Sequence, residues 1–287
     1  MSKGVVILAV GHAYYGKMAV ALASTIKVCS PAIPITILCS PGAIEYLNND
    51  ECSLFDKIII PKESYVIQGD VRYLRPKLLL YDLSPYTETL YIDADISWFN
   101  QPIEGIFNLC KDTDFCIKNY GFTNIKDTLE DKSAWASASD IRLVYKLKDE
   151  LNYSISSEII YFKKTKQTKK LFATALSIFD NPKVSFRLFA GYMADELALS
   201  ISMMVNKIYP SIVDWQPIYW RQSNKEQCSY PILRDKFYGL SMGGVRATKQ
   251  EIEIYNMLIN KAYYTLSISH PHSWINKSQF ILDRKQI

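Results

Sequence analysis

The chain has 287 residues, of which 48% are apolar and 22% are charged, and this globular composition excludes a disordered protein. Its formal net charge of +4 permits an anionic partner, but a dedicated nucleic-acid-binding protein is usually more basic. No run of 18 apolar residues and no signal-peptide pattern is present, so we expect a cytoplasmic protein without a membrane span. The six cysteines lack CxxC spacing, which predicts free thiols in a reducing compartment.

The first 60 residues alternate between short apolar runs and helical patterns. Strands are expected at 5–10, 35–38 and 57–60, and helices at 17–29 and 43–48. Such an alternation is typical of a parallel sheet with helices on both faces. Because ligands of these sheets bind at the C-terminal ends of the strands, the residues that follow each strand are candidates for ligand contacts.

The later elements follow from the same patterns. A helix is expected at 75–83, ended by Pro85, and a fourth strand at 89–92. The polar segment 121–138 is predicted to be a loop or lid. The other predicted helices are 139–151, 165–179, 194–205 and 248–261, and the other predicted strands are 114–117, 159–162 and 208–213.

The segment LYIDADISWF contains two aspartates, Asp93 and Asp95, at the end of a buried strand. Two carboxylates in such a place are costly to bury without a partner. A hard divalent cation can hold both, with waters and substrate phosphates as its other ligands. A solvated strand end is the alternative, but the flanking residues are apolar or aromatic. The pattern therefore predicts a bound Mn²⁺ or Mg²⁺.

The longer segment RPKLLLYDLSPYTETLYIDAD resembles the DxD segment of GT-A glycosyltransferases, and most of all those of family 8, which includes glycogenin-type enzymes. The resemblance extends over about residues 4–210. It implies an α/β fold of the GT-A type, with a mostly parallel central sheet and helices on both faces. It also implies that Lys77, which precedes Asp93 on a helix, contacts the phosphates of the donor.

The resemblance also implies a set of donor contacts. The segment after the first strand is similar to the uridine-holding loop of the family, which assigns nucleotide-sugar binding to Ala9, Gly11, His12, Tyr14 and Tyr15. Ala94 lies inside the DxD motif. Gly243 and Gly244 of FYGLSMGGVR are candidates to present backbone N–H groups to a diphosphate, and a plain glycine-containing turn is the alternative. The family's HFxGxxKPW segment, which supplies a histidine as third metal ligand, is absent, and His270 is the candidate replacement.

The segment GYMADELALS resembles the helix start that carries an acidic pair in the family. It implies that Asp195 or Glu196 stabilises the oxocarbenium-like sugar, or acts as nucleophile or base. Carboxylates that only complement a helix N-terminus are the alternative. The segment SISSEIIYF is similar to a family strand that usually starts Asn-Ser-Gly, but Ser156 and Glu158 replace the Asn and the Gly.

Together these features predict a metal-dependent glycosyltransferase that uses a nucleotide sugar, and the resemblance implies that this sugar is UDP-linked. The acceptor is open: a saccharide, a protein tyrosine, or a hydroxymethylated base in DNA, which would have to be flipped out of the helix. The lysine cluster in FKKTKQTKKLF keeps the DNA option open, although it is also typical of a solvated helix face. Trp215, Tyr219 and Trp220 in DWQPIYW are a candidate acceptor platform, and packing in the core is the alternative.

We expect one domain over 1–287, with a nucleotide-sugar-binding half over 1–100, an acceptor and catalytic half over 101–215 and a C-terminal elaboration over 216–287. Two other functions are open at this point. One is a haloacid-dehalogenase-type phosphohydrolase with Asp93 as its nucleophile, since that class also carries a DxD motif at a strand end. The other is a non-catalytic protein that binds sugar nucleotides.

Overall fold

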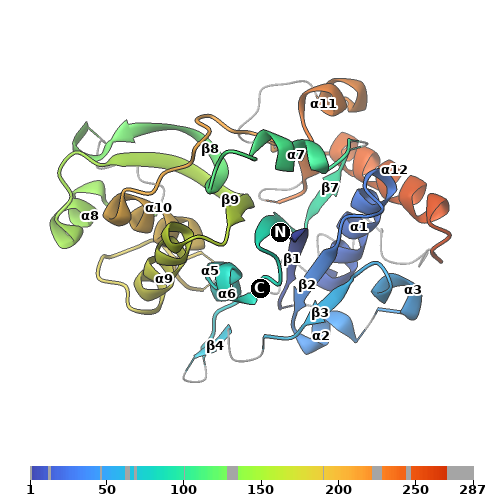
Figure 1. The fold of residues 1–287 in the computed structure, drawn as a ribbon, viewed down its shortest axis with the longest axis horizontal. Coiled ribbons are helices and arrows are strands. Elements are labelled where there is room, and N and C mark those ends of the chain that lie inside the picture. The colour runs from blue at the N-terminus through green and yellow to red at the C-terminus, as the bar shows by residue number, and fades with distance from the viewer. Residues whose placement is uncertain are drawn as a thin grey trace.

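The computed structural model describes residues 2–11, 14–45, 47–61, 65–67, 70–99, 101–127, 135–189, 191–221, 228–243 and 247–269. At its centre lies a six-stranded sheet of order β3-β2-β1-β6-β9-β8 (Figure 1). Its strands are β1 (Lys3–Ala9), β2 (Ile35–Cys39), β3 (Lys57–Ile59), β6 (Glu88–Asp93), β8 (Phe115–Asn124) and β9 (Leu151–Lys163). The first four in this order are parallel, whereas β9 is antiparallel to both β6 and β8. The predicted α/β fold with a mostly parallel sheet is therefore confirmed.

Helices cover both faces of this sheet because its strands are apolar on both sides. Val5 and Ile7 of β1 belong to one core cluster, and Val6, between them, belongs to the other. The first cluster is completed by α1 (Tyr14–Cys29) and α12 (Lys249–Thr265), and the second by α9 (Lys166–Asp180) and α10 (Asp195–Asn206). Figure 1 shows α1 beside α12, and α9 beside α10.

Short elements connect these layers. A second sheet joins β10 (Ile218–Tyr219), β11 (Gly239–Ser241) and β7 (Ile96–Trp98), and β4 (Val66–Ile67) pairs with β5 (Asp70–Val71). The remaining helices are α2 (Pro41–Ile44), α3 (Asn49–Cys52), α5 (Arg75–Leu78), α6 (Leu80–Leu83), α7 (Glu104–Leu109), η1 (Ile125–Asp127), α8 (Ala138–Tyr145) and α11 (Tyr230–Lys236). In the described parts of the chain, every helix is too short or too polar to cross a membrane. The six cysteines are free thiols.

The predicted helix at 43–48 is wrong in its bounds, because the chain forms two separate helical turns around this segment, at Pro41–Ile44 and at Asn49–Cys52. Asn48 begins the second of them: its side chain accepts a hydrogen bond from Glu51 N, and the Glu51 side chain accepts one from Asn48 N. This reciprocal capping box favours a helix start at the place where the first turn would have continued. The helix predicted at 75–83 is likewise divided at Leu79 into α5 and α6.

Three predictions around β8 and β9 are also wrong. The expected loop at 121–138 starts as strand, since β8 continues to Asn124, and the expected helix at 139–151 ends at Tyr145. Lys146 follows in the left-handed conformation (φ 55°), which stops the helix, and Leu151 begins β9. Residues 208–213 form no strand, and the carbonyl of Ile212 accepts instead from the side-chain amide of Asn119 on β8.

A bulge in β9 directs polar side chains toward the ends of the parallel strands. Ile117 of β8 pairs with Ile160, but the next residue, Lys118, pairs with Ser156. Residues 157–159 therefore lie opposite a single step of β8, close to the end of β6, where Ile92 pairs with Ile159. Because a bulge turns side chains out of the regular alternation, this irregularity gives the strand a way to present Ser157 and Glu158 to the same site.

Candidate active site

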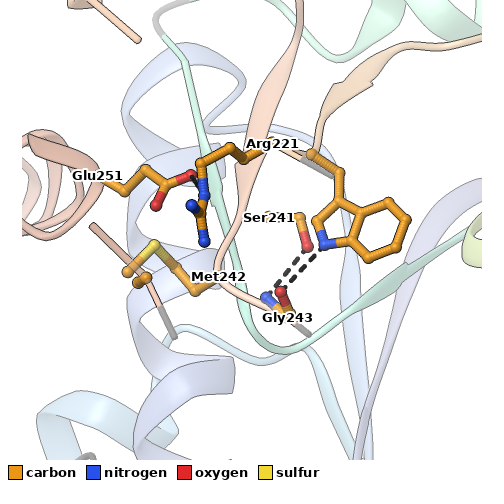
Figure 2. A pocket seen from close by; sticks show the side chains of 7 residues that line it. Arg221, Ser241, Met242, Gly243 and Glu251 are labelled. Carbon is orange, nitrogen blue, oxygen red and sulfur yellow. Dashed lines mark hydrogen bonds and ion pairs between the residues drawn. The ribbon is translucent and has the colours of Figure 1, made fainter. Parts of the chain in front are cut away.

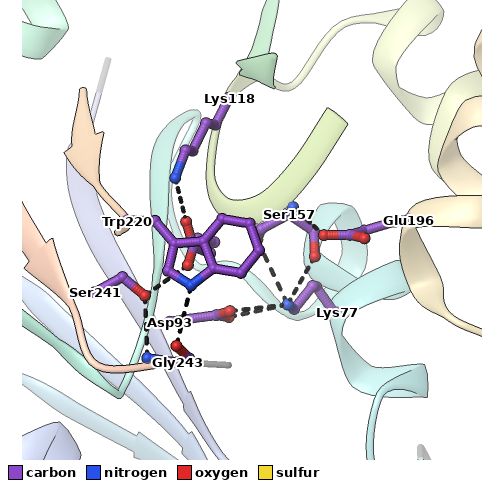
Figure 3. A network of polar contacts seen from close by, with 9 residues as sticks. Lys77, Asp93, Lys118, Ser157, Glu196, Trp220, Ser241 and Gly243 are labelled. Atoms are coloured by element: carbon purple, nitrogen blue, oxygen red, sulfur yellow. Dashed lines mark hydrogen bonds and ion pairs between the residues drawn. The ribbon is translucent and has the colours of Figure 1, made fainter. Parts of the chain in front are cut away.

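Lys77 lies at the centre of a buried polar cluster at the C-terminal end of β6. Its side chain comes from α5, and its Nζ lies 2.9 Å from Asp93 Oδ1 and 3.4 Å from Asp195 Oδ2. It also donates to Ser157 Oγ at 3.1 Å (Figure 3). Lys77 is 4% exposed and Asp195 3% exposed, whereas Asp93 is half-buried. Three segments that are distant in sequence thus converge on one ammonium group.

The charges of this cluster stabilise one another. Burial alone lowers the pKa of Lys77, but the carboxylates of Asp195 and Asp93 raise it well above its usual value. Burial raises the pKa of Asp93, whereas Lys77 and the Tyr91 hydroxyl, which donates to Asp93 Oδ1, lower it. The pKa of Tyr91 is raised well above its usual value by burial and by Asp93. At neutral pH, Lys77 is therefore a cation and Tyr91 a neutral hydrogen-bond donor.

Glu196 lies beside this cluster, in the first turn of α10. Its Oε1 accepts from Ser157 N at 3.1 Å, and its Oε2 accepts from Trp135 Nε1 at 3.2 Å. Burial, with a smaller contribution from Asp195, raises the pKa of Glu196 to about 7. A carboxyl group that titrates near neutral pH and is oriented by two N–H donors is suited to general acid–base chemistry.

A second polar group adjoins the first through the β9 bulge. Lys118 is fully buried, and its Nζ lies 2.6 Å from Glu158 Oε2. Ser241 of β11 donates to Glu158 Oε1 at 2.6 Å and accepts from Gly243 N at 3.2 Å. Trp220 Nε1 donates to Gly243 O at 3.0 Å, as Figure 3 shows. Glu158 therefore joins the central sheet to the small sheet and to the segment that carries Gly243.

A narrow cleft lies beside the second polar group, and Ser241 and Gly243 form part of its lining. Its lining includes Arg221 and Glu251, whose Nε and Oε1 lie 3.4 Å apart (Figure 2). It has room for about one water molecule. The cleft is thus too small in this structure to hold a sugar, and the polar cluster around Lys77 is the better candidate for chemistry.

The acidic residues fit a divalent cation with few protein ligands. A methyl group placed on Gly243 would lie 3.0 Å from Asp95 Oδ2, so this carboxylate faces a space that only glycine leaves open. Asp195 Oδ2 is buried and, among the described residues, has the 3.4 Å ion pair with Lys77 Nζ but no hydrogen bond. Asp93, Asp95 and Asp195 carry three negative charges and Lys77 one positive charge, which leaves a net charge of −2. Among the described residues, no three acidic, histidine or cysteine side chains gather closely enough to hold a metal by themselves.

Among the residues that the structure describes, other sequence-predicted donor residues follow the strand ends at the same sheet edge. Leu8 pairs with Asp93 across β1 and β6, so Ala9, the last residue of β1, and Gly11, which follows the strand, lie at this edge. Gly11 has φ 112° and donates to Ser40 Oγ at 3.2 Å. Tyr14 and Tyr15 begin α1 with ring centroids 4.4 Å apart, and Ala94 is buried. His12, Gly244 and His270 lie outside the described residues.

The aromatic platform predicted in DWQPIYW is wrong for two of its three rings. Trp215 and Tyr219 are buried in the core, and only Trp220 lies at the site. In contrast, Trp135 was not singled out from the sequence, although it donates to Glu196. Its position 61 residues before Glu196 gives no local pattern from which this contact can be recognised.

The sequence matches no protein-family model and no curated protein. Solved structures, in contrast, share its fold. The apo structure of the bifunctional glycosyltransferase WbbM matches with a TM-score of 0.58 and 13% identity, over 91% of this chain and 51% of that one. The galactosyltransferase LgtC, in complex with donor and acceptor sugar analogs, matches with a TM-score of 0.55 and 12% identity, over 95% of this chain and 99% of that one.

The apo form of the glycosyltransferase GlyE from Streptococcus pneumoniae TIGR4 matches with a TM-score of 0.51 and 11% identity, over 94% of this chain and 65% of that one. The chain thus spans about half the length of WbbM and nearly all of LgtC. These matches show that the chain has the fold of GT-A-type glycosyltransferases, as the sequence predicted.

Proposed function

We propose that the protein is a metal-dependent glycosyltransferase that moves a sugar from a nucleotide sugar, UDP-linked, to a hydroxyl group of a saccharide. The observation that carries this proposal is the buried group of Lys77, Asp93, Asp195 and Glu196 at the C-terminal edge of β6. In a fold shared with glycosyltransferases, this edge is where ligands of open α/β sheets bind. Fold alone does not give function, so the proposal rests on the chemistry of these side chains.

Asp93 and Asp95 are the residues that would hold the divalent cation, Mn²⁺ or Mg²⁺. When bound, such an ion supplies Lewis-acid stabilisation of the negative charge on a departing diphosphate. Lys77 contributes a second positive charge from the protein itself, fixed by Asp93 and Asp195. Because this ammonium is already oriented and desolvated, it stabilises developing charge without reorganisation.

In the proposed reaction, the bond between the anomeric carbon and the diphosphate oxygen breaks, and its electron pair stays on the diphosphate. The acceptor oxygen forms a bond to the same carbon, and its proton passes to Glu196. A base with a pKa near the working pH is the most effective one for this step. Ser157 N and Trp135 Nε1 hold the two carboxylate oxygens of Glu196 in place.

The direct test is UDP release from a panel of UDP-sugars. We expect release from at least one of them with Mn²⁺ present, and loss of release when EDTA removes the metal. Phosphate release from phosphomonoesters without any nucleotide sugar would instead support the phosphohydrolase alternative. Binding of UDP-sugars without any UDP release, with or without saccharide acceptors, would support the non-catalytic alternative. Equal release with Mn²⁺ and with EDTA would contradict the metal assignment.

The pKa of Glu196 predicts a pH dependence of activity. We expect the rate of UDP release in the presence of saccharide acceptors to rise with pH through about 7, as the carboxyl group of Glu196 ionises. Glu196→Gln should remove this rise. The surface substitution Glu253→Gln is the control, because that side chain is 62% exposed. An unchanged pH profile in Glu196→Gln would show that another group titrates.

The same shift predicts an effect on stability. The folded-state pKa of Glu196, about 7, lies above the unfolded value of about 4.3. The protonated carboxyl group therefore favours the folded state at pH 4, and this contribution to stability is lost as pH rises through about 7. Glu196→Gln should therefore raise Tm relative to wild type more at pH 8 than at pH 4. A Tm difference that is the same at both pH values would contradict the raised pKa.

The structure offers no support for the alternative DNA acceptor. Lys163 pairs with Glu88 at the start of β6, so the lysine cluster lies at the opposite edge of the sheet from Asp93. Lys163 Nζ and Lys164 Nζ donate to the backbone carbonyls of Lys111 and Ser84. Acceptor binding that weakens steeply with salt would nevertheless favour DNA over a saccharide, because displaced counterions are the signature of phosphate contacts.

A further inference from the structure

Three apolar side chains, those of Trp135, Leu188 and Phe189, lie beside Glu196 and form a surface that we call the shelf. Leu188 is 65% exposed and Phe189 47% exposed, and Trp135 is half-buried. The rings of Trp135 and Phe189 lie 5.3 Å apart at 71° to one another. Trp135 Nε1 donates to Glu196 Oε2 at 3.2 Å, so the shelf is continuous with the candidate catalytic carboxylate.

Backbone hydrogen bonds give the shelf a defined shape. Arg187 N donates to Trp135 O at 2.7 Å, which fixes the two segments side by side. Phe189 and Tyr192 exchange two backbone hydrogen bonds, of 2.8 and 3.1 Å, just before α10 begins. A shelf held in this way loses little conformational freedom when a ligand covers it, which favours binding.

The composition of the shelf differs from that of the opposite side of the site. Toward the small sheet, the site presents Lys118, Glu158 and Ser241, which form ion pairs and hydrogen bonds with one another. Toward the shelf, it presents two aromatic rings and a leucine beside a carboxylate. Sugar rings combine an apolar C–H face with a rim of hydroxyl groups, and this pairing of an aromatic face with a hydroxyl acceptor suits them.

We infer that the shelf of Trp135, Leu188 and Phe189 is the acceptor subsite, and that it binds a saccharide whose ring or aglycone is apolar on one face. The inference rests on the proposed function and adds the class of acceptor to it. An acceptor lying on the shelf has its rim hydroxyls next to Glu196, where the proposed proton transfer takes place. Phe189, the exposed ring, supplies the stacking contact, and Trp135 both stacks and orients Glu196.

Calorimetric titration with phenyl and methyl β-D-glucopyranoside, and with the matching galactosides, tests this inference without catalysis. We expect a phenyl glycoside to bind more tightly than its methyl counterpart, and Phe189→Ala to weaken the phenyl glycoside about tenfold. Phe122→Ala is the matched control, because Phe122 is also 47% exposed and has one aromatic neighbour, Tyr153, at 5.1 Å. It should leave glycoside binding unchanged.

Equal affinity of wild type and Phe189→Ala for every glycoside, or no binding of any of them, would overturn the acceptor subsite. The same result in Phe122→Ala as in Phe189→Ala would overturn it as well, because the effect would then not belong to the shelf. Failure of the proposed function has a different signature, namely glycoside binding that depends on Phe189 in a protein that releases UDP from no UDP-sugar.

Discussion

Asp93→Asn should lower the rate of UDP release about a thousandfold while the protein stays folded. The substitution removes one of the two carboxylates proposed to hold the cation, and a loss of several kcal/mol of charge stabilisation corresponds to this factor. The fold should survive because the amide oxygen of the new side chain can still accept from the Tyr91 hydroxyl. In addition, Lys77 keeps its ion pair with Asp195, in which Nζ and Oδ2 lie 3.4 Å apart. UDP release and Tm, measured on the same preparation, check both parts of this expectation.

The control for Asp93→Asn is Asp50→Asn, which removes an equal charge from an exposed position on α3. Its rate of UDP release should equal that of wild type. If Asp93→Asn also retained a rate within a few-fold of wild type, Asp93 would play no part in holding the metal or the diphosphate.

Lys77→Met should abolish UDP release and also lower the free energy of unfolding by about 3–5 kcal/mol. The reason is that the variant keeps two carboxylates, Asp93 and Asp195, around a buried position and removes the cation between them. The loss of stability should be smaller at pH 5 than at pH 8, because burial raises the pKa of Asp93 and, without Lys77 to lower it, this carboxylate takes up a proton more readily at the lower pH. Denaturant unfolding at both pH values, together with UDP release well below Tm, measures these effects.

Lys17→Met is the control that separates the loss of stability in Lys77→Met from its loss of UDP release. Lys17 Nζ lies 2.6 Å from Glu51 Oε2, which is fully buried, so this pair has a similar burial outside the site. Its loss should destabilise the protein without changing UDP release at a temperature where the variant is folded. A Lys77→Met protein that matched wild type in both stability and UDP release would show that Lys77 is not central to the cluster.

The parts of the site that the sequence predicts are those with a local pattern. An apolar run that ends in Asp93 and Asp95 indicates a strand end with costly carboxylates, and a preceding amphipathic segment places Lys77 on a helix. The resemblance of GYMADELALS to a helix start in family 8 implies Asp195 and Glu196. Asp93, Asp95 and Lys77 each lie within one element or its flank, so the local pattern is enough to place them on a strand end and a helix, whereas the resemblance to family 8 implies their roles.

The other parts depend on contacts between distant segments. Lys118 and Glu158 are 40 residues apart and meet because β9 has a bulge, which no periodicity in the sequence indicates. The contact between Trp135 and Glu196 spans 61 residues and requires the shelf to pack against α10. The predicted helix at 139–151 failed for a local reason, since Lys146 adopts a left-handed conformation that is uncommon outside glycine and asparagine.

The central claim is that the acidic edge of β6 binds a divalent cation together with a nucleoside diphosphate. Calorimetric titration of UDP into wild type and Asp93→Asn, each with Mn²⁺ and with EDTA, measures this directly. We expect UDP to bind wild type much more tightly with Mn²⁺ than with EDTA, and Asp93→Asn to lose this difference. UDP affinity that is the same in all four titrations, or no binding of UDP to wild type with Mn²⁺, would contradict it.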